Sequence, residues 1–376
     1  NYKIIFFNSN KWFTIDCYYL NVVTMSIIRK RKLTKNQTRQ IQKNHQTVDD
    51  QYLFSGVIVA HFGKQLDVQI TALPDDPSNY PNSTQSLIVG EVCRCHVRTN
   101  LPLLSAGDLV KFSLNPQDSS TGVIEILLPR STLITRPDRY HKLKPVASNV
   151  DVLAIVFAPL PKPSTNLIDR YLLIAKLSKV TPLLILNKAD LLENFVDVSK
   201  IFEEYQFLGE KYGFNVIQTS YQDKQSIIEL KHQINHKICV FAGQSGVGKS
   251  SLINTLLPHA NQSTNVISTN SELGQHTTTT SRFLAYDDAD LTKGGIIDTP
   301  GIREYGVWHL SPDEILYGFD ELFELSGTCQ FRDCTHKANS KGCNFWKMVE
   351  NGEILSRRID SFNELYTEAK NSKSSH

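Results

Sequence analysis

Two patterns of hydrophobic and polar positions divide the chain. From Leu53 onward, short segments in which apolar and polar residues alternate are separated by glycine and other turn residues. Such alternation indicates strands, and five strands within about eighty residues are typical of a small closed barrel of the OB type. The predicted strands are residues 55–63, 66–70, 91–97, 108–112 and 122–128. Barrels of this kind often bind single-stranded or structured nucleic acid.

The second pattern begins at Asp151, after a polar, proline-containing connector between Pro129 and Val146. Residues 151–158 form a continuous apolar run, which is typical of a strand buried on both faces of a parallel sheet, and helical periodicity follows at 166–180. Further strands are predicted at 183–186, 215–217, 238–242, 282–286 and 295–297, mostly with helical segments between them. This alternation predicts an α/β fold with helices on both faces of the sheet.

Composition and charge exclude only a few classes of protein. A chain of 376 residues with 40% hydrophobic content is long enough for two or three domains. Its 40 basic and 38 acidic residues nearly cancel, so a net charge of +2 neither requires nor excludes nucleic acid as a partner. The sequence has no run of about eighteen apolar residues, so we expect no membrane segment. Its seven cysteines do not resemble a disulfide framework, which favours a reducing, cytoplasmic location.

The N-terminal segment is interpreted separately. Residues 1–24 are fairly apolar, but polar residues interrupt them and no cleavage site is evident, so a signal peptide is not indicated. Met25 fits a natural start, and we interpret 1–24 as upstream or expression-derived sequence. Seven basic residues and no acidic one occur between Arg29 and Lys43, which predicts a mobile arm for a polyanion at 25–50. A solubilising tail is the alternative.

The segment GQSGVGKS, from Gly243 to Ser250, is the most specific motif. It lies between an apolar strand and a predicted helix, the order that a phosphate-binding loop needs. Its glycines let successive N–H groups point at one anion, while Lys249 reaches the β- and γ-phosphates and the Ser250 hydroxyl ligates magnesium. The residues predicted to bind the nucleotide phosphates are Gly243, Gln244, Ser245, Gly246, Val247, Gly248, Lys249, Ser250 and Ser251.

A second motif, Asn187, Lys188, Ala189 and Asp190, ends the second predicted strand. The Asp190 carboxylate can accept hydrogen bonds from N1–H and the exocyclic amine of guanine, whereas adenine offers neither donor there. Sites of this kind reject a mismatched analogue by factors of up to about 10⁴ to 10⁵. The motif therefore predicts a preference for GTP. Thr219 and Ser220, at the end of the next strand, are expected to offer backbone N–H to guanine O6, with an ordinary strand exit as the alternative.

The loop after the strand at 295–297 carries Asp298, Thr299, Pro300 and Gly301. Asp298 is expected to hold the magnesium shell, and the Gly301 N–H is expected to approach the γ-phosphate. Ras-type enzymes position the attacking water with a glutamine after this glycine, but here the position is Ile302, so another side chain must do so.

The segment 274–279 lies between the phosphate loop and the magnesium loop, where a first switch belongs. Thr278 is expected to complete the magnesium shell. His276 is the candidate catalytic residue, because an imidazole with a pKa near 6.5 can orient or deprotonate water at neutral pH. The alternative is that His276 is an exposed loop residue that contacts RNA or nothing.

The order of these motifs is unusual. In Ras-like GTPases the phosphate loop comes first and the base-reading motif last, yet here Asn187 precedes Gly243 by 56 positions. The same sheet can still assemble if the chain is circularly permuted, because the core depends on contacts and not on where the termini fall. The permutation places the C-terminal region directly after the magnesium loop.

Three cysteines and one histidine cluster near the C-terminus. Cys329, Cys334, His336 and Cys343 form the ligand set of a closed tetrahedral zinc site with a structural role; packing cysteines or a disulfide are the alternatives. Helices are predicted after Ser311 and around 345–366. We expect these segments, with Lys347, Arg357 and Arg358, to pack beside the metal and offer an RNA surface.

From Met25 to the C-terminus, these motifs and their permuted order resemble the RsgA (YjeQ) family of circularly permuted GTPases. The resemblance implies an OB-type barrel at 51–130, a circularly permuted P-loop GTPase domain at 131–306 and a helical zinc-binding domain at 307–376. It also implies the 30S ribosomal subunit and its 16S rRNA as partners, and it points to His276 in hydrolysis. Asn339, Ser340 and Lys341 depart from the family pattern of an acidic residue and proline before Gly342, which concerns loop stiffness and not ligation.

The resulting hypothesis is a monomeric GTPase that hydrolyses GTP with magnesium and acts in late maturation of the small subunit, stimulated by that subunit. The alternative is an RNA-binding module whose nucleotide domain only senses GDP and GTP. A small-molecule kinase is disfavoured, because the motif at 187–190 reads a base and nothing signals a second substrate pocket.

Overall fold

The computed structural model describes residues 4–8, 11–15, 50–62, 65–75, 88–115, 118–138, 142–257, 281–287, 291–299, 306–338 and 340–374. The chain divides into two units, residues 1–47 and 48–376. In the first unit, β1 (Ile4–Asn8) and β2 (Lys11–Ile15) pair as an antiparallel hairpin. The predicted basic arm at 29–43 lies outside the described residues.

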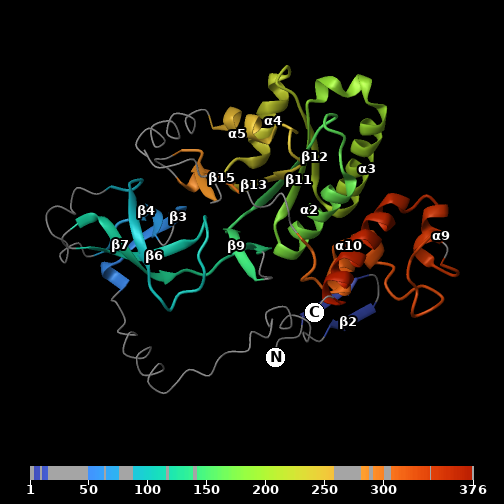
Figure 1. Cartoon of the computed structure of the whole chain (residues 1–376), viewed down its shortest axis with the longest axis horizontal. Coiled ribbons are helices and arrows are strands. Elements are labelled where there is room, and N and C mark those ends of the chain that lie inside the picture. The colour runs from blue at the N-terminus through green and yellow to red at the C-terminus, as the bar shows by residue number, and fades with distance from the viewer. Residues whose placement is uncertain are drawn as a thin grey trace. The chain divides into compact units, whose positions relative to one another are not determined.

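The predicted barrel is present at the start of the second unit (Figure 1). After η1 (Asp50–Tyr52), its strands are β3 (Phe54–Phe62), β4 (Gln65–Ala72), β5 (Val92–Val97), β6 (Leu109–Asn115) and β7 (Asp118–Leu127). They pair in the order β3-β4-β5-β7-β6, and the β6–β3 pairing closes the ring. Only β5 and β7 run parallel. Cys93 and Cys95 alternate with exposed residues of β5 and are buried in the barrel core.

The connector after the barrel folds into a hairpin that the sequence analysis did not predict. β8 (Leu133–Pro137) pairs with β9 (Leu143–Ser148). Ser148 donates its N–H to the Ala106 carbonyl in the barrel. Gly107 has a φ of +88°, and a Cβ there would lie 2.3 Å from the Ser148 carbonyl oxygen, so only glycine allows this close approach. The barrel loop is thereby held against the next domain.

Six described strands form the predicted α/β sheet, in the spatial order β12-β11-β10-β13-β15-β14 (Figure 1). They are β10 (Val152–Phe157), β11 (Thr181–Asn187), β12 (Asn215–Thr219), β13 (Lys237–Gly243), β14 (Arg282–Ala285) and β15 (Gly294–Asp298). All except β14 run parallel to their neighbours. β14 also pairs with the barrel through Arg282 and Ala60.

Helices cover both faces of this sheet. The helical elements are α2 (Thr165–Ser178), η3 (Ala189–Asn194), α3 (Val196–Tyr212), α4 (Lys224–Ile234), α5 (Lys249–Leu256) and η4 (Leu291–Lys293). Leu153 and Ile155 of β10 pack in the same core as Tyr171 of α2 and Tyr205 of α3. The alternate residues of β10 pack with α4 and α5 on the other face. Both faces are therefore apolar, which explains the continuous hydrophobic run.

The C-terminal region contains α7 (Pro312–Tyr317), α8 (Asp320–Phe323), α9 (Asn344–Glu350) and α10 (Ser356–Ser374). A capping box between Ser311 and Glu314 fixes the start of α7. The apolar core of this region includes Leu173, which α2 contributes, together with Phe319 and Phe362. No helix in the described part of the chain combines the length and the apolar character that crossing a bilayer requires.

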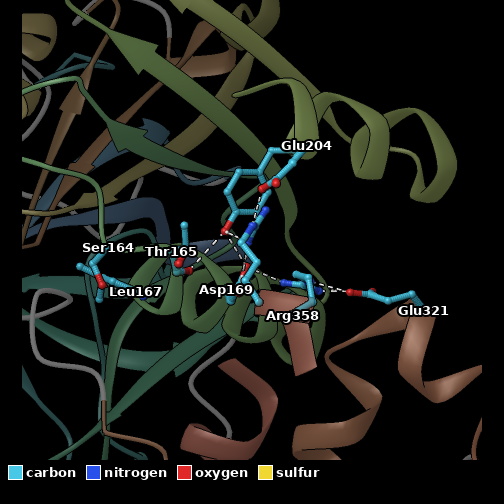
Figure 2. A network of polar contacts seen from close by, with 9 residues as sticks. Ser164, Thr165, Leu167, Asp169, Glu204, Glu321 and Arg358 are labelled. Atoms are coloured by element: carbon cyan, nitrogen blue, oxygen red, sulfur yellow. Dashed lines mark hydrogen bonds and ion pairs between the residues drawn. The ribbon is translucent and has the colours of Figure 1, made fainter. Parts of the chain in front are cut away.

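A buried ion network joins α10 to the α/β domain (Figure 2). Arg358 lies between two carboxylates: its Nη1 donates to Asp169 Oδ1 of α2 at 2.5 Å, and its Nε donates to Glu321 Oε1 of α8 at 2.5 Å. The Tyr205 hydroxyl of α3 donates to the same Asp169 oxygen at 2.6 Å. Arg358, Asp169 and Glu321 are each 5% exposed or less. Burial lowers the pKa of Arg358, but the two carboxylates raise it by more, so the guanidinium stays charged.

The neighbouring Arg357 also turns toward the α/β domain. Its Nε donates to Glu204 of α3, and its Nη1 lies 3.2 Å from the Tyr205 hydroxyl. The expectation that Arg357 and Arg358 offer an RNA surface is therefore wrong, because both arginines contact carboxylates at the domain junction; Lys347 is exposed. Helical periodicity could not show this, since it identifies the buried face of α10 but not the groups that this face meets.

Candidate nucleotide site and metal centre

The phosphate loop connects β13 to α5 at the carboxyl edge of the sheet, where ligands bind in open α/β folds. Three of its residues, Gly243, Gly246 and Gly248, have positive φ angles of 136°, 83° and 96°. A Cβ on Gly243 would lie 2.1 Å from the Val156 carbonyl oxygen of β10. The backbone can adopt this curve beside β10 only because these positions are glycine.

Asn187 connects the base-reading motif to the phosphate loop. It is fully buried at the end of β11, its Nδ2 donates to the Val247 carbonyl at 2.9 Å, and its Oδ1 accepts from Thr219 Oγ1 at 3.1 Å. A Cβ on Gly248 would lie 2.4 Å from Asn187 Nδ2. Lys188 reaches the same loop, donating from Nζ to the carbonyls of Gly246 and Leu160, each at 2.8 Å. These hydrogen bonds join the end of β11 to the end of β12 and to the phosphate loop that follows β13.

Asp190 is exposed beside this junction, on η3. Its Oδ1 accepts a hydrogen bond from Ser220 Oγ at 2.6 Å, and its Oδ2 lies 3.4 Å from Gln222 Nε2. The Ser220 N–H, which the sequence analysis assigned to guanine O6, instead donates to Ser226 Oγ at 3.1 Å. In this structure Thr219 and Ser220 therefore orient Asn187 and Asp190 through their side chains, and the expected backbone contact to the base is not supported at Ser220.

Four of the predicted phosphate and magnesium residues, Gly243, Lys249, Ser250 and Asp298, line one small hollow. It is lined by Lys249 and Ser250 from the phosphate loop and by Asp298 and Thr299 from the end of β15. β13 and β15 are adjacent parallel strands, so their carboxyl ends meet at the same edge. Lys249 Nζ donates to the Gly243 carbonyl at 2.8 Å and to the Gln244 carbonyl at 2.5 Å.

Thr299 adds an observation that the sequence did not suggest. Its side chain is buried, and its Oγ1 has no hydrogen-bond partner within the described structure. A buried hydroxyl that lacks a partner beside Ser250 and Asp298 fits a hollow that accepts polar groups of a ligand. The remaining predicted residues of this part of the site, His276, Thr278 and Gly301, lie outside the described residues.

The four predicted metal ligands converge in the C-terminal region. One ligand atom from each of Cys329, Cys334, His336 and Cys343 can be chosen so that all four lie within 4.8 Å of one another. Cys329 Sγ and Cys343 Sγ each lie 3.6 Å from His336 Nδ1. Zinc bonds of about 2.3 Å to sulfur and 2.0–2.1 Å to nitrogen place tetrahedral ligand atoms about 3.5–3.8 Å apart. The two distances to His336 therefore fit tetrahedral coordination, and the cluster could bind a metal ion.

The surroundings of His336 fix its ring. The imidazole stacks on Phe345 with centroids 4.0 Å apart, and the His336 carbonyl accepts from Trp346 Nε1 at 2.8 Å and Asn363 Nδ2 at 3.0 Å. Burial lowers the pKa of His336, which favours the neutral form that a metal ligand needs. Residues of α9 and α10 thus hold the ligand loop in place.

Together these features define a class of protein. A glycine-rich phosphate loop, the motif from Asn187 to Asp190 and an aspartate beside the loop serine occupy one sheet edge, with strand β11 ahead of the phosphate-loop strand β13 in the chain. This is a circularly permuted P-loop GTPase with an OB-type barrel before it and a Cys₃His cluster after it.

Comparison with known proteins identifies the family. The family model described as RsgA GTPase matches residues 127–308. The small ribosomal subunit biogenesis GTPase RsgA of Alcanivorax borkumensis is 40% identical over 357 residues, covering 89% of this chain and 95% of that protein. The protein of the same name from Yersinia pseudotuberculosis is 36% identical and covers 92% of this chain and 97% of its own length.

Two crystal structures are similar to this chain in fold and sequence. YjeQ from Thermotoga maritima matches with a TM-score of 0.59 and 28% identity over 85% of this chain and 99% of its own. YloQ, described as a circularly permuted GTPase, matches with a TM-score of 0.59 and 26% identity over 86% of this chain and 97% of its own. The chain belongs to the RsgA family of GTPases.

Proposed function

We propose that this protein hydrolyses GTP while bound to the small ribosomal subunit and acts in the maturation of that subunit. The partner proposed is the 30S particle with its 16S rRNA, approached by a monomer. The observation that supports the GTP-dependent part is a pair of buried hydrogen bonds from Asn187 to Val247 and Thr219, which join the motif that ends at Asp190 to the phosphate loop. The names of the relatives, small ribosomal subunit biogenesis GTPases, support the partner.

In this proposal magnesium is held by Ser250, Asp298 and Thr278. When bound, the ion would neutralise charge on the β- and γ-phosphates. Lys249 would move from the Gly243 and Gln244 carbonyls to the phosphates, and Gly301 would donate its N–H to the γ-phosphate. His276 would orient or deprotonate the attacking water, since Ile302 stands where Ras-type enzymes carry a glutamine.

Turnover with and without purified 30S subunits tests the proposal. We expect the subunits to stimulate GTP hydrolysis, and we expect His276→Ala to lose about a hundredfold or more of the stimulated rate while it still binds GTP and the subunit. Thr255→Ser is the control. The Thr255 hydroxyl donates to the Ser251 carbonyl within α5, and serine keeps this hydroxyl. Near-normal stimulated turnover of His276→Ala would remove this residue from the mechanism. Absence of turnover in the wild type would favour the nucleotide-sensing alternative.

The Cys₃His cluster is proposed to bind one structural zinc ion through Cys329, Cys334, His336 and Cys343. Metal removal is expected to unfold residues from about 325 onward but to leave nucleotide binding intact, because these ligands hold a loop outside the α/β sheet. Elemental analysis should find about one zinc per chain, and the cuts that limited proteolysis gains after chelation should all lie in the C-terminal region. A Cys334→Ser variant that keeps zinc and its protease resistance would contradict the assignment.

A further inference from the structure

The turn that carries Ser220 is held by hydrogen bonds within the turn itself, to η3 and to α4. Within the turn, Asp223 donates its N–H to the Ser220 carbonyl at 3.2 Å, and Gln222 donates its N–H to Ser220 Oγ at 3.1 Å. From η3, the Asp190 carboxylate accepts from Ser220 Oγ. From α4, Ser226 Oγ accepts the Ser220 N–H and lies 2.7 Å from the Asp223 carbonyl oxygen.

Ser226 has a single hydroxyl proton, and its shortest acceptor contact is the Asp223 carbonyl. The lone pairs of its oxygen are then available to accept from Ser220, whose N–H lies in a buried part of the turn. Ser226 and Ser220 are 8% and 4% exposed, so water cannot readily replace this bond. Loss of the hydroxyl would leave a buried N–H without a partner and would loosen the turn at Ser220.

Capping of α4 does not account for this contact. Asp223 is already the N-cap, and its Oδ1 accepts from the Gln225 N–H at 2.9 Å. The bond between Ser226 and Ser220 reaches back past the N-cap to the end of β12, outside the helix. It leads to the Asp190 carboxylate, because the same Ser220 donates its hydroxyl to Asp190 Oδ1 at 2.6 Å.

We propose that Ser226 is a positioning residue for guanine recognition, which holds the Asp190 carboxylate through Ser220. This inference rests on the proposed binding of guanine nucleotides. Asp190 is exposed, so its carboxylate keeps one orientation only where neighbours bond it. Guanine gives this carboxylate two donors, N1–H and the 2-amino group, whereas hypoxanthine gives only N1–H. A carboxylate that is held less firmly therefore loses more affinity for GDP than for IDP.

The test measures binding of GDP and IDP by calorimetry, which avoids turnover. Ser226→Ala is expected to lower the preference for GDP over IDP by about three- to tenfold, the effect of one lost hydrogen bond. Ser226→Thr, which keeps a hydroxyl, should restore most of the preference. Gln225→Ala is the matched control, since this exposed neighbour on α4 contributes only its backbone N–H to the turn.

Ser220→Ala supplies a second test that remains valid if Ser226→Ala folds poorly, because it removes the hydroxyl that bonds Asp190 and should itself lower the preference for GDP. In a double-mutant cycle, Ser226→Ala and Ser220→Ala combined should show the preference of Ser220→Ala alone if Ser226 acts through the Ser220 hydroxyl. An unchanged GDP:IDP ratio in folded Ser226→Ala, equal losses for both nucleotides, or additive effects in the cycle would each overturn the proposal. A wild-type protein that binds GDP, IDP and ADP equally would instead overturn the guanine assignment itself.

Discussion

Asp190→Asn is expected to reverse the base preference of the site from GTP to xanthosine triphosphate. Ser220 Oγ donates to Asp190 Oδ1, so an asparagine amide should turn its oxygen to Ser220 and its Nδ2 to the base. The N–H donor then faces the 2-amino group of guanine but pairs with the C2 carbonyl of xanthine. GTP affinity should fall by up to about 10⁴, the range in which polar sites reject a mismatched analogue.

Competition of GTP, xanthosine triphosphate and ATP against a fluorescent guanine nucleotide measures this preference. Asp223→Asn is the matched control, because it makes the same change in the neighbouring turn that carries Ser220, at a position that caps α4, and asparagine is an equally good N-cap. The control should keep the wild-type preference for GTP. An Asp190→Asn protein that still selects GTP over xanthosine triphosphate would refute the role of Asp190.

Arg358→Met is expected to free the C-terminal helices from the α/β domain. Methionine fills a similar volume but leaves Asp169 and Glu321 buried without this cation, and removal of one partner from a buried ion pair costs about 3–5 kcal/mol. Hydrogen exchange followed by mass spectrometry should show α10 opening more than a hundredfold more often. This local measurement is preferable to a global unfolding midpoint, because a protein of several domains need not unfold in one step.

Arg94→Met in the barrel is the matched control. Arg94 also makes two bonds to a carboxylate, Asp67, at 2.9 and 3.2 Å, but its side chain is 45% exposed. Exposed ion pairs contribute about 0–1 kcal/mol, so local exchange in the barrel should change little. If Arg358→Met left exchange of α10 unchanged, the network would not be what holds the C-terminal region in place.

Much of the fold could be predicted because the order of apolar and polar residues along each strand matches the faces of that strand that are buried. The run 151–158 is apolar at successive positions, and β10 is buried on both faces between two pairs of helices. The alternating strands of the barrel are buried on one face only, as Cys93 and Cys95 illustrate. The hairpin of β8 and β9 was missed because prolines and polar residues interrupt its pattern, and its place depends on contact with the barrel at Ala106.

By itself the sequence determined the motifs whose chemistry lies within a few residues: the glycines of the phosphate loop, Asn187 and Asp190, and the Cys₃His cluster. Only the tertiary structure decided how distant residues act on them. Ser220 donates a hydrogen bond to Asp190, which lies 30 residues earlier in the chain, and Arg358 forms an ion pair with Asp169, which lies 189 residues earlier. The reason is physical: a polar side chain looks the same in a sequence whether water or a buried partner satisfies it, and folding brings that partner from another element.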